Sequence, residues 1–356
     1  MSADMQQTAE GAAARQDFDI DRLSAYLAPR LPGFGGHIAV ERCKGGQSNP
    51  TFLVTAGKRR FVLRSKPIGT LLPTAHAVDR EYRVTAALAG TGVPVAPAHL
   101  LCEDSSVVGT SFYLMDFVDG RIFWDPSLPG MAPAQRGALY DELGRVMAAL
   151  HQVDPVAVGL GDFGEGGSFV ARQLARWSRQ YRASETQPIA AADALIDWLP
   201  QQPPSQRQTC IVHGDFRIDN VIYHPTEPLI LAVLDWELST LGDPLVDFAY
   251  HCMSWRLPPA LRGLAGRDLA TLGIPDEASY LRRYLERTGR TYEIPQADWT
   301  YYLVFNMFRL VCILQGIAAR ALKGTASSEH AADIGRHAQP LAEQAWALAQ
   351  TISAQR

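Results

Sequence analysis

Residues 211–237 read IVHGDFRIDNVIYHPTEPLILAVLDWE, and this stretch decides how the rest of the chain is interpreted. Asp215 and Asn220 follow one apolar run closely, and Asp235 ends the last one. Polar side chains that a rigid scaffold presents at the tips of strands often carry chemistry. The spacing of these three residues indicates which chemistry that is.

Two short strands are predicted on either side of the turn HPTEP, at 221–223 and 230–234. Strands joined by so short a loop pair as an antiparallel hairpin. The hairpin would return Asp235 to the level of Asn220. One segment would then present an aspartate to a nucleophile, and an amide and a carboxylate to a metal ion.

Phosphoryl transfer uses this set of groups. An aspartate orients the acceptor hydroxyl and takes its proton, and oxygen ligands hold Mg²⁺ against the phosphates. The catalytic loop of protein kinases has the pattern H-R-D-x-x-x-x-N followed by D-F-G; the corresponding letters here are HGDFRIDN and DWE. Asp and Asn near turns also serve as simple caps, so the loop pattern alone does not establish the activity.

The composition is that of a globular protein, with 356 residues, 47% hydrophobic residues and a net charge of −4. This balance argues against broad nucleic-acid or anionic-membrane binding. The sequence shows neither a signal-peptide core nor an uninterrupted apolar window of about 18 residues, so we expect no membrane span and a cytoplasmic location. Five scattered cysteines without a CxxC pair predict free thiols.

The element pattern predicts an α+β, two-lobed, protein-kinase-like fold. Residues 1–17 are expected to be a disordered leader, 18–118 a small β-rich N-terminal lobe, and 119–356 a larger, mostly helical C-terminal lobe. In the first lobe, Thr51–Thr55 and Arg60–Ser65 flank AGK and predict a hairpin. In the second, helices are predicted at 133–152, 168–182, 190–199, 276–289, 296–323 and 329–354.

The segment VHGDFRIDNVIY…LAVLDWELSTLGDPLVDFAY resembles the aminoglycoside-phosphotransferase-like kinases, most closely the subgroup fused to, or encoded near, acyl-CoA dehydrogenases. The resemblance covers roughly residues 25–330 and is more specific in the C-terminal lobe. It implies a kinase that uses ATP and Mg²⁺. By this resemblance Asp215 is the catalytic base, and Asn220 and Asp235 are the magnesium ligands.

The nucleotide is expected to bind the N-terminal lobe. The loop CKGGQSNPTFLV occupies the position of a phosphate-covering loop, where Gly46 permits close approach of the backbone, and Ser48 and Asn49 could donate hydrogen bonds to phosphate. The resembling antibiotic-modifying kinases place a lysine on the next strand. Arg64 stands there in this chain, and Glu81 on the following helix is the candidate to hold it.

Two further predictions concern the neighbours of this site. Lys66 is a rival to Arg64 as the phosphate-binding cation. The run FYLMDFVDG predicts a strand and a connection between the lobes, in which adenine would stack between apolar walls and bond to the backbone near Asp116 to Val118.

The partner is expected to be a small molecule that carries a hydroxyl group, with neither nucleic acid nor a membrane involved. No dense acidic patch suited to an aminoglycoside is evident in the C-terminal helices. In YHCMSWRLPP, Trp255 and Arg256 are candidates for binding a hydrophobic or anionic acceptor. The resemblance implies a hydroxyacyl-CoA or a related hydroxy acid, and a small amino alcohol is the competing acceptor.

Two alternatives belong to other functional classes. A nucleotide-binding pseudokinase or interaction module is favoured only by arginine in place of lysine. A metal-dependent hydrolase built on His213 and Asp215 would need further ligands, and His224 and His251 are badly placed for one cluster. We instead expect His213 to brace the catalytic loop and Asp247, in GDPLVDFA, to anchor it.

Overall fold

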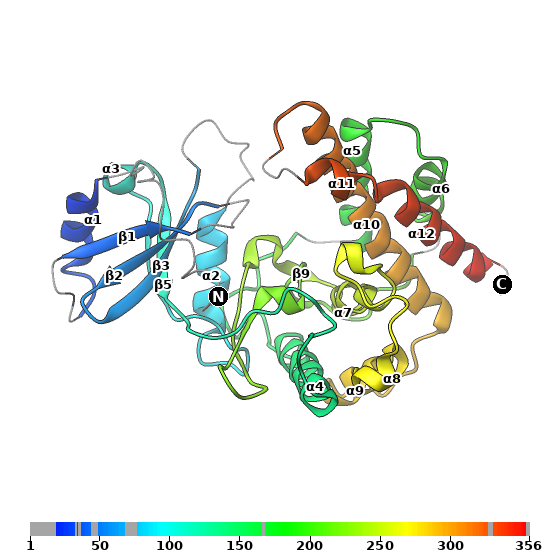
Figure 1. Cartoon of the computed structure of the whole chain (residues 1–356), viewed down its shortest axis with the longest axis horizontal. Coiled ribbons are helices and arrows are strands. Elements are labelled where there is room, and N and C mark those ends of the chain that lie inside the picture. Colours follow the sequence, from blue (N-terminus) through cyan, green and yellow to red (C-terminus); the bar gives the residue numbers. More distant parts are fainter. Residues whose placement is uncertain are drawn as a thin grey trace. The chain divides into compact units, whose positions relative to one another are not determined.

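The chain divides into two compact units, coloured along the sequence in Figure 1. The computed structural model describes residues 19–32, 34, 37–43, 49–67, 77–165, 168–201, 203–326 and 330–353. The predicted leader, Gly46 and Ser48 lie outside these described residues. Unit 1 comprises Met1–Ile122, Val158–Leu160 and Asp219–Ser239, and unit 2 comprises Phe123–Ala157, Gly161–Ile218 and Thr240–Arg356.

Unit 1 is built on a five-stranded antiparallel sheet of order β1-β2-β3-β5-β4. Its strands are β1 Ile38–Arg42, β2 Thr51–Ala56, β3 Arg59–Ser65, β4 Ala98–Cys102 and β5 Phe112–Asp116. The predicted hairpin is confirmed, because β2 and β3 pair across a turn at Gly57. Gly57 has a φ of 60°, a left-handed conformation that glycine adopts without steric cost.

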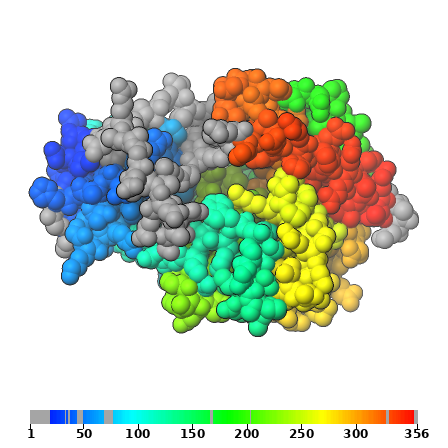
Figure 2. Space-filling view, in the orientation of Figure 1, coloured from blue at the N-terminus to red at the C-terminus, as the bar shows by residue number. Residues whose placement is uncertain are grey.

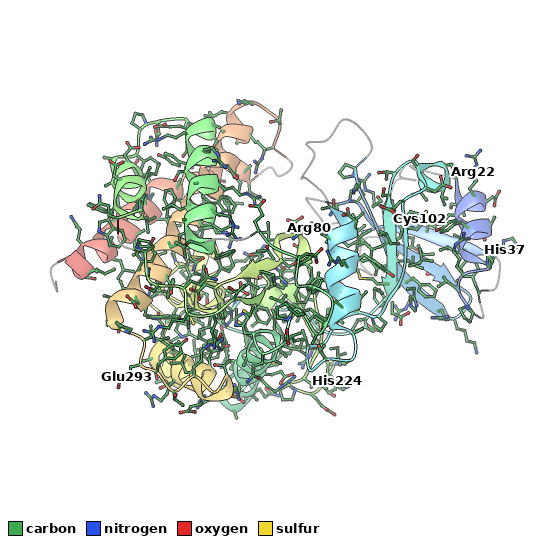
Figure 3. The ribbon with its side chains drawn as sticks, turned by 180° about the vertical axis from the view of Figure 1, so that it is seen from behind. Arg22, His37, Arg80, Cys102, His224 and Glu293 are labelled. Atoms are coloured by element: carbon green, nitrogen blue, oxygen red, sulfur yellow. The ribbon has the colours of Figure 1, made fainter. Side chains whose placement is uncertain are left out.

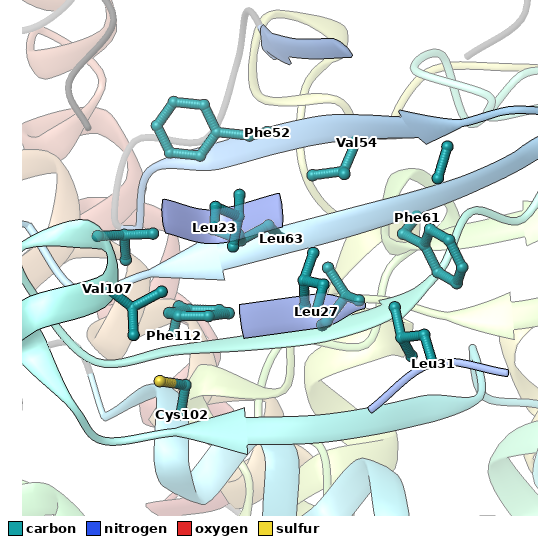
Figure 4. Packing of buried hydrophobic residues seen from close by; sticks show 13 residues of the cluster. Leu23, Leu27, Leu31, Phe52, Val54, Phe61, Leu63, Cys102, Val107 and Phe112 are labelled. Atoms are coloured by element: carbon teal, nitrogen blue, oxygen red, sulfur yellow. The ribbon is translucent and has the colours of Figure 1, made fainter. Parts of the chain in front are cut away.

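The two faces of this sheet have different partners, as the alternation of side chains along a strand requires. One face packs against α1, Ile20–Leu27, and α3, Ser105–Val108. Figure 4 shows this apolar core, in which Leu23 and Leu27 of α1 contact residues from β2, β3 and β5. The other face is covered by α2, Val78–Leu88. Side chains that point away from the core of Figure 4 therefore point toward α2.

A second hairpin belongs to unit 1, although it lies about a hundred residues further along the chain. It consists of β7, Val221–Tyr223, and β8, Ile230–Val233. The backbones of Arg121 and Tyr223 exchange two hydrogen bonds of 2.8 Å, and Arg121 also donates to the carbonyl of His224, labelled in Figure 3. Gly120 is required here, since a β-carbon would overlap the Tyr223 carbonyl oxygen.

These contacts explain how the observed division differs from the predicted one. The sequence predicts two continuous lobes that meet at residues 118 and 119, whereas the first unit runs to Ile122 and includes Asp219–Ser239. The β7–β8 hairpin bonds to the backbone of unit 1 through the pairing described above and through Val233, whose N–H donates to the Pro94 carbonyl at 2.9 Å.

Unit 2 is mostly helical. Its helices are α4 Pro133–Leu150, α5 Phe169–Ser184, α6 Ala190–Trp198, α7 Pro244–Cys252, α8 Leu269–Leu272, α9 Glu277–Arg287, α10 Gln296–Leu322, α11 Ala331–Gly335 and α12 Ala338–Ser353. Five of the six predicted helices match α4, α5, α6, α9 and α10 to within two residues at each end. The prediction of a single helix at 329–354 is wrong, because the helix is interrupted between α11 and α12. Pro340 has no N–H to donate to the carbonyl four residues earlier, so a new helix begins with Pro340 in its first turn.

The long helix α10 forms the core of unit 2. It packs against α5, α7 and α12, and Figure 2 shows α12 in red at the surface of this unit. By length and composition α10 would suffice to cross a membrane, with a mean hydropathy of 1.6 over its most apolar window. Of that window, 72% is buried inside the structure, as in the core helix of a globular protein.

All five cysteines fall within the described residues and are free thiols, as predicted. Four of them are buried, and Cys43 is partly exposed. Burial raises the pKa of the Cys43 thiol, so even this residue remains protonated and unreactive near neutral pH.

Candidate active site

Arg64 faces α2 because of its place in β3. Its neighbours Leu63 and Ser65 are buried on the opposite side of the strand, with Leu63 in the core shared with α1. The guanidinium of Arg64 therefore meets Glu81 on α2, where its Nε lies 3.1 Å from a carboxylate oxygen. The predicted pairing of Arg64 with Glu81 is confirmed.

Arg64 also contacts Asp235, the candidate metal ligand that follows β8 and Leu234. Its terminal nitrogen lies 3.3 Å from Oδ1 of Asp235. Both side chains belong to unit 1. Glu81 is 1% exposed and Asp235 is 35% exposed, so the buried carboxylate fixes the arginine and the more open one remains accessible. Burial acts to lower the pKa of Arg64, but the negative charge of Glu81 outweighs it and the pKa is raised.

Lys66, the rival cation, is paired with another residue. Its Nζ lies 3.1 Å from the carboxylate of Asp79 in the first turn of α2, and both side chains are about one third exposed or more. The structure thus places Arg64, and not Lys66, between the two carboxylates.

Glu81 is held by two further hydrogen bonds. The side-chain nitrogen of Asn49 donates to it at 2.6 Å, and the hydroxyl of Tyr113 donates at 3.1 Å. Burial raises the pKa of the Glu81 carboxyl, and the charge of Arg64 opposes that rise. Asn49 was expected to donate to phosphate; the structure shows that its side-chain nitrogen orients Glu81, and a nucleotide contact by Asn49 stays a prediction.

Asn220 and Asp235 are brought to the same level, as the hairpin predicts. A 3-10 helix, Ile218–Asn220, leads into β7, and the strands pair with Val221 opposite Val233. The N–H of Leu234 then donates to the carbonyl of Asn220 at 2.8 Å. The predicted hairpin is confirmed, and it positions the two candidate metal ligands.

The backbone at Asp235 is unusual. Its φ of 63° and ψ of 62° are left-handed, a conformation that is uncommon outside glycine and more frequent for Asp and Asn. After it the chain enters a 3-10 helix, Trp236–Leu238, and α2 bonds to the end of this segment through Arg80, labelled in Figure 3, which donates to the Ser239 carbonyl at 3.4 Å. Strain of this kind concentrates at functional sites.

These residues fit a magnesium ion by their chemistry. Asn220 offers an amide oxygen and Asp235 a partly exposed carboxylate, and Mg²⁺ prefers such hard oxygen ligands. Mg²⁺ commonly binds one or two protein groups and completes its coordination with water and substrate phosphates. The donor set is therefore suited to a nucleotide-bound ion.

Asp215 lies in unit 2, in the loop after β6, Cys210–Val212. This strand pairs with β9, Thr240–Gly242, which the sequence analysis did not predict. Gly214 has a φ of 82°, so the chain turns sharply just before Asp215. His213 is fully buried, and its Nδ1 accepts the N–H of Asp215 at 3.1 Å. The prediction that His213 braces the loop is confirmed.

Asp247, in the first turn of α7, anchors the same loop through its side chain. One carboxylate oxygen accepts the N–H of His213 at 2.7 Å, and the other accepts that of Gly214 at 2.9 Å. The ring of His151 lies 3.2 Å from the first oxygen. Burial alone would raise the pKa of Asp247, but the hydrogen bonds from His151 and the backbone outweigh it and lower the pKa. The predicted anchoring role is confirmed.

Tyr250 is a site residue that the sequence analysis missed. Its hydroxyl donates to Oδ1 of Asp215, and Arg217 lies 3.4 Å from the same oxygen. Burial and the charge of Asp215 raise the pKa of Tyr250, so the hydroxyl keeps its proton and remains a donor. The available signal was its position three residues after Asp247, which places both residues on one face of α7.

Asp116 and Val118, near which adenine is predicted to bind, lie at and just beyond the end of β5. The N–H of Asp116 donates to the Pro97 carbonyl at 2.9 Å, and its carboxylate is hydrogen-bonded to His99. Val118 packs in a small apolar cluster with Ala96, Met115, Ile122, Ile222, Ala232 and Leu234. This cluster has the apolar character of an adenine wall, and adenine binding there stays a prediction.

The expectation for Trp255 and Arg256 is contradicted. The indole N–H of Trp255 donates to the Pro275 carbonyl at 2.8 Å. Arg256 forms two hydrogen bonds of 2.9 Å with the carboxylate of Glu277 at the start of α9. Both side chains therefore hold unit 2 together, and Arg256 is already neutralised by a carboxylate that lies far away in the sequence.

The burial of His251 predicts that the stability of the protein depends on pH. It is buried on α7, with the Tyr280 hydroxyl 3.1 Å from its Nε2 and Asp247 nearby, and burial lowers its pKa from 6.5 to about 4. The unfolded chain takes up a proton near pH 6.5 whereas the folded protein does not, so stability falls as the pH drops through this window. Because of His251, the free energy of unfolding should fall by about 3 kcal/mol as the pH drops from neutral to about 4.

The measurement is urea unfolding of the wild type and of His251→Gln at several values of pH. Glutamine keeps a polar partner for Tyr280 but does not titrate. The wild type should lose more stability than His251→Gln between pH 6.5 and pH 4. Equal losses in the two proteins would show that His251 is not responsible.

Comparison with known proteins identifies similar chains. Residues 39–293 match the phosphotransferase enzyme family. Mouse acyl-CoA dehydrogenase family member 10 is 49% identical over 334 residues, which are 92% of this chain, but the chain spans only 31% of that relative's length. A solved structure from Ralstonia eutropha, provisionally assigned as an aminoglycoside phosphotransferase, is 53% identical with a TM-score of 0.86 and covers 94% of this chain and 99% of its own.

A more distant solved structure shows the fold alone. Choline kinase from Cryptosporidium parvum is 12% identical with a TM-score of 0.63, and the match covers 95% of this chain and 97% of that chain. The predicted α+β, kinase-like fold is thereby confirmed, with its antiparallel sheet in unit 1 and its helices in unit 2.

Proposed function

Because the chain belongs to the phosphotransferase enzyme family, we propose that it is an ATP-dependent kinase that transfers the γ-phosphoryl group to the hydroxyl of a small molecule. The observation that carries the proposal is the joint presence of Arg64, Asn220 and Asp235 in unit 1 and of the anchored Asp215 in unit 2. The chain thus has a candidate residue for each of these roles.

The residues would divide the work as follows. Asp215 accepts the proton of the acceptor hydroxyl. The oxygen of that hydroxyl bonds to the γ-phosphorus while the bond from this phosphorus to the ADP oxygen breaks. Tyr250 holds the Asp215 carboxylate in place. Arg64, oriented by Glu81, binds phosphate oxygens of the nucleotide. Asn220 and Asp235 would hold Mg²⁺, which when bound neutralises phosphate charge.

The acceptor belongs to the same proposal. Similarity to an acyl-CoA dehydrogenase family member supports a hydroxyacyl-CoA or a related hydroxy acid. A small amino alcohol or an aminoglycoside is the competing acceptor within the same reaction class, since solved kinases of such molecules share the fold.

One observation favours a second function. Arg64 is bound to Asp235 itself, which ties the candidate metal ligand to a cation. If this ion pair persists when nucleotide binds, the protein is a nucleotide-binding interaction module without transferase activity. The thermal-shift titration described next separates the two functions.

The test is a thermal-shift titration with ATP and GTP, with and without Mg²⁺. A ligand at a hundred times its dissociation constant should add about 2.7 kcal/mol of stability. We expect a rise in melting temperature that depends on Mg²⁺ and is lost in Asp235→Ala. The matched control is Asp21→Ala, an exposed aspartate on α1, on the other face of the sheet, and it should respond as the wild type does.

Three outcomes are informative. A Mg²⁺-dependent rise that Asp235→Ala abolishes supports the kinase. A rise that neither Mg²⁺ nor Asp235→Ala alters favours the interaction module. No rise with either nucleotide contradicts both.

A further inference from the structure

Four side chains of unit 2 contact one another, and we refer to them as the arginine–aromatic cluster: Arg176 and Trp177 of α5, Tyr250 of α7 and Arg309 of α10. The guanidinium carbon of Arg309 lies 5.2 Å from the ring centre of Trp177 and 4.6 Å from that of Tyr250. That of Arg176 lies 5.4 Å from Trp177. Two cations therefore share one indole ring.

The cluster has positive charge without a matching negative charge. Within the described residues, no carboxylate oxygen lies within 4.0 Å of either Arg176 or Arg309. Burial lowers the pKa of Arg176, and the charge of Arg309 lowers it further, as expected for cations held close together. Arg176 is exposed, but Arg309 is buried, and an uncompensated buried charge is costly, so a site that keeps one commonly serves to bind its opposite.

The cluster also contains hydrogen-bond donors that the described residues leave unsatisfied. Arg309 is 8% exposed, and its Nε has no hydrogen-bond partner. The indole nitrogen of Trp177, which is 5% exposed, has none either. Buried donors are nearly always bonded in folded proteins, so two in one cluster indicate a missing acceptor.

Tyr250 connects the cluster to the reaction. Its ring contacts Arg309 on one side, and its hydroxyl donates to Asp215 at the other end. The negative charge of Asp215 is itself matched by Arg217 at 3.4 Å. A molecule whose hydroxyl reached Asp215 could therefore extend past Tyr250 and place a further group at Arg309.

We propose that the arginine–aromatic cluster is the subsite that binds an anionic group of the acceptor, a carboxylate or a phosphate monoester. The inference rests on the proposed kinase function, because the acceptor is defined by that reaction. Arg309 and the indole of Trp177 donate hydrogen bonds to the anion, and Arg176 adds its charge. The same two cations repel an ammonium group, so the cluster selects hydroxy acids and phosphorylated alcohols over amino alcohols.

The test measures binding directly, by isothermal titration calorimetry of the full chain with four probes that share one alkyl chain. These are hexanoate, hexyl phosphate, hexylamine and hexanol. We expect hexanoate or hexyl phosphate to bind at least about 10-fold more tightly than the amine and the alcohol, as for charge-assisted hydrogen bonds. Comparison of the two anions identifies whether the group is a carboxylate or a phosphate.

Variants of single residues assign the binding to the cluster. Arg309→Gln should weaken the preferred anion by about 10-fold or more, and Arg309→Lys should restore part of the loss because it keeps the charge. Arg176→Gln, at an exposed position, tests the same cluster if Arg309→Gln does not fold. The matched control is Arg320→Gln, an exposed arginine of α10, which should bind as the wild type does.

The outcomes separate this inference from the proposed function. Tight binding of hexylamine, binding of no anion, or anion binding that neither Arg309→Gln nor Arg176→Gln weakens would overturn the anion subsite. If ATP still stabilises the protein in that case, the kinase proposal stands. If the anion binds through Arg309 but no nucleotide stabilises the protein, the subsite stands and the kinase proposal fails.

Discussion

Asp215→Asn is expected to lower the rate of phosphoryl transfer by about 10²- to 10⁴-fold, the usual contribution of a positioned general base. Asparagine keeps an oxygen that accepts the hydrogen bond of Tyr250, so the geometry of the loop should survive. The variant loses the negative carboxylate that accepts the proton of the acceptor and pairs with Arg217. The expected signature is a fall in kcat while the folded structure is retained.

The measurement is ADP release in the presence of an acceptor, accompanied by thermal unfolding. Asp197→Asn is the matched control, because it makes the same chemical change at an exposed position of α6 in the same unit. It should leave the rate and the stability unchanged. A rate for Asp215→Asn within a few-fold of the wild type would remove Asp215 from the catalytic role.

Asp247→Ala is expected to destabilise the protein by about 3–5 kcal/mol, because several buried donors lose their acceptor at about 1–3 kcal/mol each. The substitution leaves the N–H groups of His213 and Gly214 without an acceptor. It also removes the hydrogen-bond partner of the His151 Nε2 atom, while the other ring nitrogen lies 2.6 Å from the Tyr284 hydroxyl. The energy comes from buried donors that lose their partner, and not from the small volume removed.

Asp247→Asn sharpens this prediction. Both carboxylate oxygens of Asp247 accept a backbone N–H, and an amide has only one oxygen. Its nitrogen would face a donor, so Asn should be nearly as destabilising as Ala. Urea unfolding checks both variants, with Asp197→Ala as the exposed control. Full stability in Asp247→Asn would mean that the loop does not depend on this anchor.

The parts of the site that could be predicted from the sequence depend on short segments. The hairpin that carries Asn220 and Asp235 follows from two apolar runs and a turn of five residues. The Arg64–Glu81 pair follows from the order of a strand and the next helix. In each case the partners are close in the chain, so local pattern suffices to bring them together.

The parts that were missed depend on partners that the local pattern does not specify. Arg256 was expected to be available to an anionic acceptor, yet Glu277, 21 residues further along the chain, binds it. Asn49 finds Glu81 only after the sheet has formed. Pairing of β6 with β9 brings together two three-residue strands that have little pattern of their own. Tertiary contacts decide such positions.

The membership of residues 219–239 in unit 1 has a consequence for how the chain folds during synthesis. The backbone groups of Pro94 and Arg121 gain their partners, Val233 and Tyr223, only when the β7–β8 hairpin has been synthesised. The first 122 residues therefore cannot complete their own fold when they leave the ribosome. They must wait until Ser239 has been made, while most of α4, α5 and α6 is already available to collapse. An N-terminal fragment that stops at Ile122 would expose the apolar side chains of Ala96 and Val118, which makes it a substrate for chaperones and a poor choice for separate expression.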